Sequence, residues 1–193
     1  MIREKSVYMR SMMRAVGAFV LAYGGACTAY DPVHEDQVNL LGGELASIPQ
    51  GEYHRAGQPC TTCHGPAGPA SKQFSMAGTI FATQDSTVGV AGAQVLMVDS
   101  LGSSPPGGSV VTNCVGNFFI TPDIWDPAFP VRVAVATPTT GAQMIEHIGR
   151  EASCAGCHSD PRGETSPGHV YLNTTPQPDD PTCPVSPVAG GKP

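Results

Sequence analysis

Charged and aromatic residues are scarce in this sequence of 193 residues, at 13% and 6% respectively. Lysine and arginine number only 10 against 16 acidic residues, and the resulting formal net charge of −6 argues against a nucleic acid partner. There is no Ser-His-Asp set, phosphate-binding glycine loop or zinc-protease motif, so hydrolase and nucleotide-dependent functions have no support. Glycine and proline are abundant instead, at 23 and 19 residues, and they predict short strands and irregular coil with little helix.

Residues 1–26 have the layout of an export signal. Four basic residues precede an apolar run from Ala15 to Tyr23, and three small residues follow it. The apolar run is too short for a permanent membrane anchor, so we expect the segment to be removed. Its removal takes away a net charge of +3 and leaves an acidic chain of formal charge −9. We therefore expect an exported protein of the periplasm, outer membrane or cell surface.

Cys27 stands directly after these small residues. This arrangement resembles the lipobox of bacterial lipoproteins, in which the new N-terminal cysteine takes a lipid, and it predicts a lipid anchor at Cys27. Gly24 occupies the position where a large aliphatic residue is expected, so ordinary signal cleavage nearby is the alternative. Thr28 in the next position favours the outer membrane over the inner one.

The pattern Cys-x-x-Cys-His occurs twice, and it is the strongest chemical signal in the sequence. Two cysteines at this spacing can bond both vinyl groups of one haem, and the next histidine can bind the iron. One zinc ion held by four cysteines, or a redox-active dithiol, is the alternative, but neither accounts for the two histidines. The sequence thus predicts two covalently attached haem c groups, with cysteines and proximal iron ligands at Cys60, Cys63, His64, Cys154, Cys157 and His158.

The second axial ligand of each iron decides between electron transfer and ligand chemistry. His54 and His147 precede their motifs by six and seven residues, and we take them as the candidate distal ligands. Each can serve the haem next in sequence or the other haem. Crossed ligation is a real alternative because a histidine so close to a motif has difficulty reaching round its own porphyrin. The reserve candidates are His34, His169, Met76 and Met144, whereas Met97 lies in an alternating apolar run that is typical of a core strand.

The cysteine count leaves one further pair. With four cysteines assigned to haem and Cys27 to lipid, Cys114 and Cys183 remain and are the candidates for a disulfide. Two free thiols are the alternative. The bridge would tie the proline-rich tail, residues 174–193, to the middle of the chain.

Residues 74–149, between the two motifs, carry a β pattern. Short apolar or alternating runs separated by Gly, Pro, Asp and Ser predict a small β-sandwich with strands over 74–83, 93–99, 109–113, 117–121, 131–137 and 143–148. An even number of strands would bring both ends of the sandwich, and both motifs, to the same side.

Three segments of this region carry a family resemblance. The stretches 77–81, 89–95 and 113–118, with their Gly-Ala-x-Val strand and Gly-x-Phe turn, resemble the carboxypeptidase regulatory-like domain, a transthyretin-like β-sandwich of exported proteins. The resemblance covers about 70 residues. It implies a non-catalytic module for scaffolding or interaction, and Cys114 departs from the usual residue of the family.

The expected architecture is therefore mainly β, an immunoglobulin- or transthyretin-like sandwich flanked by two irregular haem-binding segments, 27–73 and 150–173. The leading functional hypothesis is single-electron transfer with redox proteins, either other cytochromes or membrane oxidoreductases. A haem peroxidase or gas-binding sensor is the first alternative. The second is a structural subunit that assembles through the sandwich, with copies of itself or with a larger cytochrome complex.

Overall fold

The computed structural model describes residues 31–44, 48, 50–175 and 183. The expected export signal, the lipidation candidate Cys27 and most of the proline-rich tail lie outside the described residues. The chain divides into one unit that ends at Asp36 and a second that begins at Gln37. Helix α2, Pro32–Leu40, crosses this boundary, and its first turn is capped by the Asp31 carboxylate, which accepts the N–H groups of Val33 and His34. None of the helices in the described ranges has the length and apolar character to span a bilayer.

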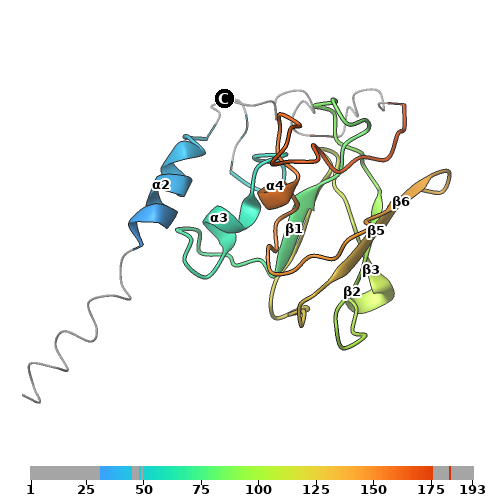
Figure 1. Ribbon diagram of the computed structural model, residues 1–193, viewed down its shortest axis with the longest axis horizontal. Helices are drawn as coiled ribbons and strands as arrows, with labels where there is room; N and C mark the ends of the chain where they lie inside the picture. The colour runs from blue at the N-terminus through green and yellow to red at the C-terminus, as the bar shows by residue number, and fades with distance from the viewer. Residues whose placement is uncertain (1–30, 45–47, 49, 176–182, 184–193) are drawn as a thin grey trace, which may run out of the picture. The chain divides into compact units, whose positions relative to one another are not determined.

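The second unit is built on short antiparallel strands (Figure 1). One sheet pairs β1 with β4, and the other has the strand order β3-β2-β5-β6. In the described part of the chain the six strands are β1 Met76–Thr79, β2 Gln94–Val98, β3 Ser109–Val111, β4 Asn117–Ile120, β5 Arg132–Ala136 and β6 Gly141–Gln143.

The expectation of a mainly β protein with little helix is confirmed, and five predicted strand ranges each contain one observed strand. The sixth prediction, 143–148, is wrong in its position. The strand β6 ends at Gln143, and in the rest of the predicted range, 144–148, the one β-bridge is that between Ile148 and Val131. The apolar residues that suggested a longer strand are not all buried, since Ile145 is 99% exposed and contributes no packing to hold an edge strand in place.

Both sheets contribute to one apolar core. In β2, Val95 and Met97 are buried while Gln94, Leu96 and Val98 point outward, as the period of two in a strand requires. The expected core position of Met97 is confirmed. Met76 and Ile120 from the paired strands of the first sheet join the same buried cluster, which also holds Ile80, Phe118, Trp125, Val131, Val135 and Leu172.

A disulfide joins Cys114 and Cys183, whose Cα atoms are 5.8 Å apart and whose sequence separation is 69 residues. The predicted pairing is therefore confirmed. Both cysteines pack against a second, smaller apolar cluster of Ile48, Ala56 and Val115. The bridge ties a residue of the tail to the turn that precedes β4.

Candidate functional site

The first Cys-x-x-Cys-His motif folds as a single helical segment, α3, Cys60–His64. Pro59 precedes it in an extended conformation, and Gly65 ends it with an N–H that donates to the carbonyl of Thr61 at 2.8 Å. Residues three apart lie on one face of a helix, so Cys60 and Cys63 are presented together. The chain then folds back tightly, and a Cβ at Gly68 would stand 2.1 Å from the Cys63 carbonyl oxygen. Only glycine allows this approach.

The second motif also forms a short helix, one residue shorter than the first. Helix α4, Cys154–Cys157, is followed by His158, whose N–H donates to the Cys154 carbonyl at 2.7 Å. Cys154 and Cys157 are again three residues apart on a helical turn. Both motifs thus present their two cysteines on one helical turn, but His64 is the last residue of α3 whereas His158 directly follows α4.

Each motif histidine is oriented by a backbone carbonyl further along the chain. His64 Nδ1 lies 2.7 Å from the carbonyl oxygen of Lys72, eight residues on, and His158 Nδ1 lies 2.9 Å from that of Gly168, ten residues on. A carbonyl only accepts, so in the neutral imidazole Nδ1 carries the proton and Nε2 keeps its lone pair. Metal-binding histidines are commonly held in this way, because the outer hydrogen bond sets both the tautomer and the ring orientation.

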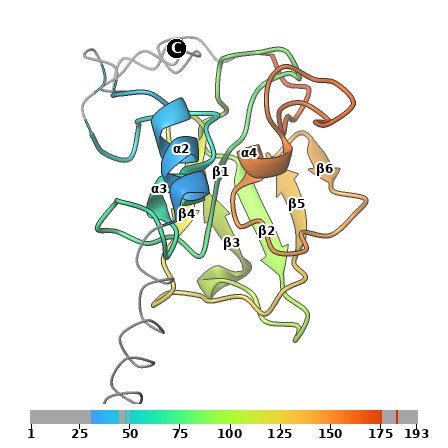
Figure 2. The ribbon, with the colours of Figure 1, turned by 60° about the vertical axis from the view of Figure 1, so that its left-hand side comes forward.

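The helices of the two motifs lie side by side (Figure 2), and contacts between them join residues 90 or more positions apart in sequence. The backbone N–H of Cys60 donates to the hydroxyl of Ser153 at 3.0 Å. The Thr61 hydroxyl donates to the Glu151 carboxylate at 3.0 Å, and that carboxylate also accepts the Ser153 N–H at 2.8 Å. This arrangement agrees with the one expected for an even number of strands.

Strand β1 supports both helices, through packing and through a parallel bridge between Ala77 and Ser153. Its Gly78 faces α4 so closely that a Cβ would stand 2.4 Å from Cys154 Sγ, 2.7 Å from Cys154 Cβ and 3.0 Å from Phe118. A side chain at this position has no room unless α4 moves. Gly78 therefore sets how closely the second motif approaches the sheet.

Replacing Gly78 with alanine is expected to lower the free energy of unfolding by about 1 to 3 kcal/mol, the usual cost of overpacking. Gly163→Ala is the matched control, because a Cβ at Gly163 meets nothing within 4 Å, and its effect should stay below about 0.5 kcal/mol. Urea unfolding of the three proteins gives the comparison. Equal effects of the two substitutions would show that α4 does not depend on the small residue beneath it.

Three of the four motif thiols have pKa values shifted away from the reactive form. Burial raises the pKa of Cys60 to about 11 and that of Cys154 to about 12, and it also raises the pKa of Cys63. Reactive cysteines have the opposite shift, because the thiolate is the nucleophile. The arrangement therefore gives no support to a catalytic thiol or a redox-active dithiol.

A cavity of about 900 Å³ lies against α3. Its volume is within the range of cofactor and small-molecule sites, roughly 300–1,000 Å³. Cys60, Cys63 and His64 line one part of the wall. An aromatic stack continues it, because the His64 ring lies 4.1 Å from Phe74, which in turn lies 4.6 Å from Phe119. The donors of the first motif thus face a space with an apolar aromatic wall.

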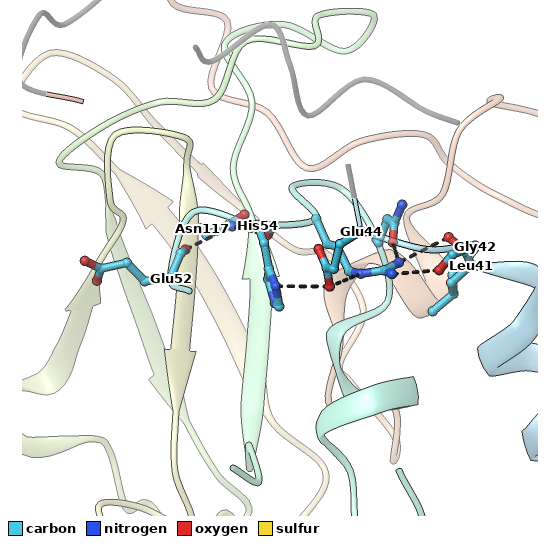
Figure 3. A network of polar contacts seen from close by, with 8 residues as sticks. Leu41, Gly42, Glu44, Glu52, His54 and Asn117 are labelled. Atoms are coloured by element: carbon cyan, nitrogen blue, oxygen red, sulfur yellow. Dashed lines mark hydrogen bonds and ion pairs between the residues drawn. The ribbon is translucent and has the colours of Figure 1, made fainter. Parts of the chain in front are cut away.

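His54 lines the same cavity, and its ring centroid is 5.9 Å from that of His64. The His54 Nδ1 atom lies 3.4 Å from the Glu44 carboxylate, a contact drawn in Figure 3. Burial lowers the pKa of His54; Glu44 opposes this shift, and His64 and Arg55 add to it. The imidazole is therefore neutral at neutral pH, as a metal ligand must be.

The other candidate ligands lie elsewhere. His147 is exposed, Met144 is half-buried and Met76 is 1% exposed in the apolar core. The ring of His169 stacks on Phe81 at 4.0 Å, and its Nδ1 is 3.2 Å from the carbonyl oxygen of Ser86. His34 lies on α2 in the first unit, and its buried Nε2 has no hydrogen-bond partner among the described residues.

Within the described ranges, no three His, Cys, Asp or Glu side chains are grouped so as to hold a metal ion. A haem iron needs fewer protein ligands, since the porphyrin nitrogens supply most of its coordination. The donors present fit such a group better than a bare ion: one histidine beside two cysteines in each motif.

Some residues that shape the site carry no sequence signal. Ser153 and Glu151 stand before the second motif, but nothing in the sequence relates them to Cys60 and Thr61. No pattern in the sequence marks Glu44 or Gly78 as part of the site either. Only their contacts in the folded chain identify them.

Comparisons with protein-family models, with curated proteins and with solved structures found no match to this chain.

Proposed function

We propose that this chain is an exported dihaem c-type cytochrome that transfers single electrons between redox partners. Cys60 and Cys63 would attach one haem and Cys154 and Cys157 the other, with His64 and His158 as the proximal ligands. Bound haem would supply an iron that takes up and releases one electron. The observation that carries the proposal is the paired histidine geometry: each Nδ1 is engaged by a backbone carbonyl, which leaves Nε2 for the metal.

The neighbouring positions of the two motifs support electron transfer within the chain. Ser153 and Glu151 connect the helices α3 and α4 through hydrogen bonds of 3.0 Å, so the two attachment sites keep a set separation. Electron exchange between two centres requires such closeness. Burial raises the pKa values of Cys60 and Cys154, which favours attachment sites over catalytic cysteines.

We assign the sheets to the transthyretin-like sandwich that the sequence resembles. Two antiparallel sheets that share one apolar core support this assignment. The sandwich would act as the scaffold from which both attachment helices project, because β1 packs against α3 and α4.

The expected location is the periplasm or the cell surface, with lipid at Cys27 as the anchor. The disulfide between Cys114 and Cys183 supports an oxidising compartment. The acidic composition favours a basic or neutral redox protein as partner.

The test is a haem count on the intact protein, made with its own leader in a bacterium that matures c-type cytochromes. We expect the mass of the processed chain plus two haems, a visible Soret band, and a pyridine haemochrome value of two haems per chain. The same chain made without the maturation machinery is the control and should have the bare mass. A bare mass and no Soret band from the competent host would overturn the proposal.

A further inference from the structure

His54 and His64 face one cavity from two different segments of the chain. Their ring centroids are 5.9 Å apart, and their planes are inclined at 59°, so the rings are not stacked on one another. Metal–imidazole bonds are about 2 Å long, which places the centroids of two imidazoles on opposite sides of one ion roughly 6 Å apart. The observed separation therefore suits two ligands of one metal.

The segment that carries His54 is anchored on both sides. The side-chain amide of Asn117, at the start of β4, donates to the carbonyl of His54 at 3.0 Å. The N–H of Gly57 donates to the hydroxyl of Thr79, at the end of β1, at 2.8 Å. Between these two anchors Ala56 is buried. The position of His54 relative to α3 is thus set by the first sheet.

Arg55 holds the same segment from the other direction. Its backbone has a φ of 51°, in the left-handed region that side chains other than glycine rarely adopt. Its guanidinium donates to the carbonyls of Leu41 and Gly42 at 3.1 and 2.7 Å, and to Glu44 at 2.9 Å. A strained backbone conformation persists only where the surrounding structure holds it, and these hydrogen bonds hold Arg55 in place. Figure 3 shows this network beside His54.

Glu44 orients the imidazole itself. One carboxylate oxygen is 3.4 Å from His54 Nδ1 and 2.9 Å from Arg55 Nε, so it lies between the two side chains. This approach is a close contact and not a hydrogen bond, because the buried Nδ1 has no hydrogen-bond partner among the described residues. With Nδ1 turned toward a carboxylate, Nε2 is left to act as a ligand.

We propose that His54 is the second axial ligand of the haem attached at Cys60 and Cys63, and that Glu44 is the residue that positions its imidazole. The inference rests on the proposed function. It assigns His54 to its own motif rather than to the haem of the other motif. Six-coordinate iron at this site favours electron transfer over the binding of peroxide or gas.

The test uses the full haem-loaded chain and its ferric spin state, measured by electron paramagnetic resonance with haem counted separately. In His54→Ala we expect two haems per chain, of which one changes from low spin to high spin, and added imidazole should restore it. Gln50→Ala is the matched control, since Gln50 lines the same cavity and has no imidazole to offer the iron. This control should leave the spin states of both haems as they are in the parent protein.

A chain that carries only the second haem, through Cys60→Ala and Cys63→Ala, separates own-motif from crossed ligation. His54→Ala in that background should leave the spectrum unchanged, and a change would establish crossed ligation and overturn the assignment. If His54→Ala fails to fold, His54→Met is the second variant. A methionine that binds the iron in place of His54 should raise the reduction potential of one haem only. An unchanged potential in that variant would also overturn the assignment.

Glu44→Gln tests the positioning role. The iron should stay low spin, while the potential of the first haem rises, because a neutral amide makes the imidazole a less basic ligand. An unchanged potential would remove Glu44 from the assignment. Failure of the proposed function is distinct from all of these results, since the parent protein would then contain no haem at all.

Discussion

Under the proposed function, replacing Cys60 and Cys63 together with alanine is expected to lower the haem content from two per chain to one. Each motif is a complete local unit, with its own pair of cysteines on a helical turn and its own histidine bonded to a carbonyl. The second site should therefore mature without the first. The pyridine haemochrome value should halve, and the intact mass should fall by one haem.

The same variant separates haem from zinc. If a single zinc ion were held by four cysteines, removal of either pair would abolish all cofactor binding rather than half of it. The reciprocal change, Cys154→Ala with Cys157→Ala, is the matched control and should also leave one haem. Loss of both haems from either variant would contradict independent attachment. That result would show that haem attachment at one helix depends on the other. Ser153, directly before α4, accepts a hydrogen bond from the N–H of Cys60 in α3.

Replacing Cys114 and Cys183 with serine is expected to lower the free energy of unfolding by about 3 to 5 kcal/mol. The disulfide closes a loop of 69 residues, and a loop of this length restricts the unfolded chain strongly. Part of the effect is local, because both cysteines pack on Ile48, Ala56 and Val115. Urea unfolding of the haem-loaded protein measures the change.

Mild thiol reduction of the parent protein is the control for this variant. Thioether bonds to haem resist reductant, so only the disulfide should open, and the reduced protein should unfold at the same urea concentration as the serine variant. A midpoint that does not move in either protein would show that the bridge does not restrain the chain. Haem content should stay at two in both, since neither cysteine belongs to a motif.

The disulfide is also connected to the first motif. Cys114 lies between β3 and β4, next to Asn113, whose side chain donates to the carbonyl of Glu52. Glu52 lies two residues before His54, and Asn117 binds the carbonyls of both. The turn that carries the disulfide thus holds the segment that faces the cavity, which gives the bridge a structural role at the candidate site.

The strand predictions succeeded where burial enforces alternation. Val95 and Met97 are buried on one side of β2, and the pattern of the sequence reflects this directly. The prediction failed at β6, an edge strand whose residues are exposed, because no packing requirement there ties the pattern to the structure. The disulfide was predictable by counting, since the motifs left one pair of cysteines unassigned in the described part of the chain.

The ligand predictions show the limit of sequence spacing. His54 and His147 stand at similar distances before their motifs and are indistinguishable as patterns. In the folded chain His54 lies 5.9 Å from the histidine of its own motif, whereas His147 is exposed. The difference comes from β1 and β4, which hold the His54 segment against the cavity.

By itself the sequence determined the local chemistry: where two cysteines and a histidine share a helical turn, which cysteines remain to form a bridge, and which runs alternate. Those properties depend on neighbours a few residues apart, so spacing is enough to predict them. The tertiary structure alone decided that the first motif bonds to the residues just before the second, which carbonyls orient His64 and His158, and why Gly78 has no side chain. These contacts join distant parts of the chain, and only the packing of helices on β1 brings them within reach.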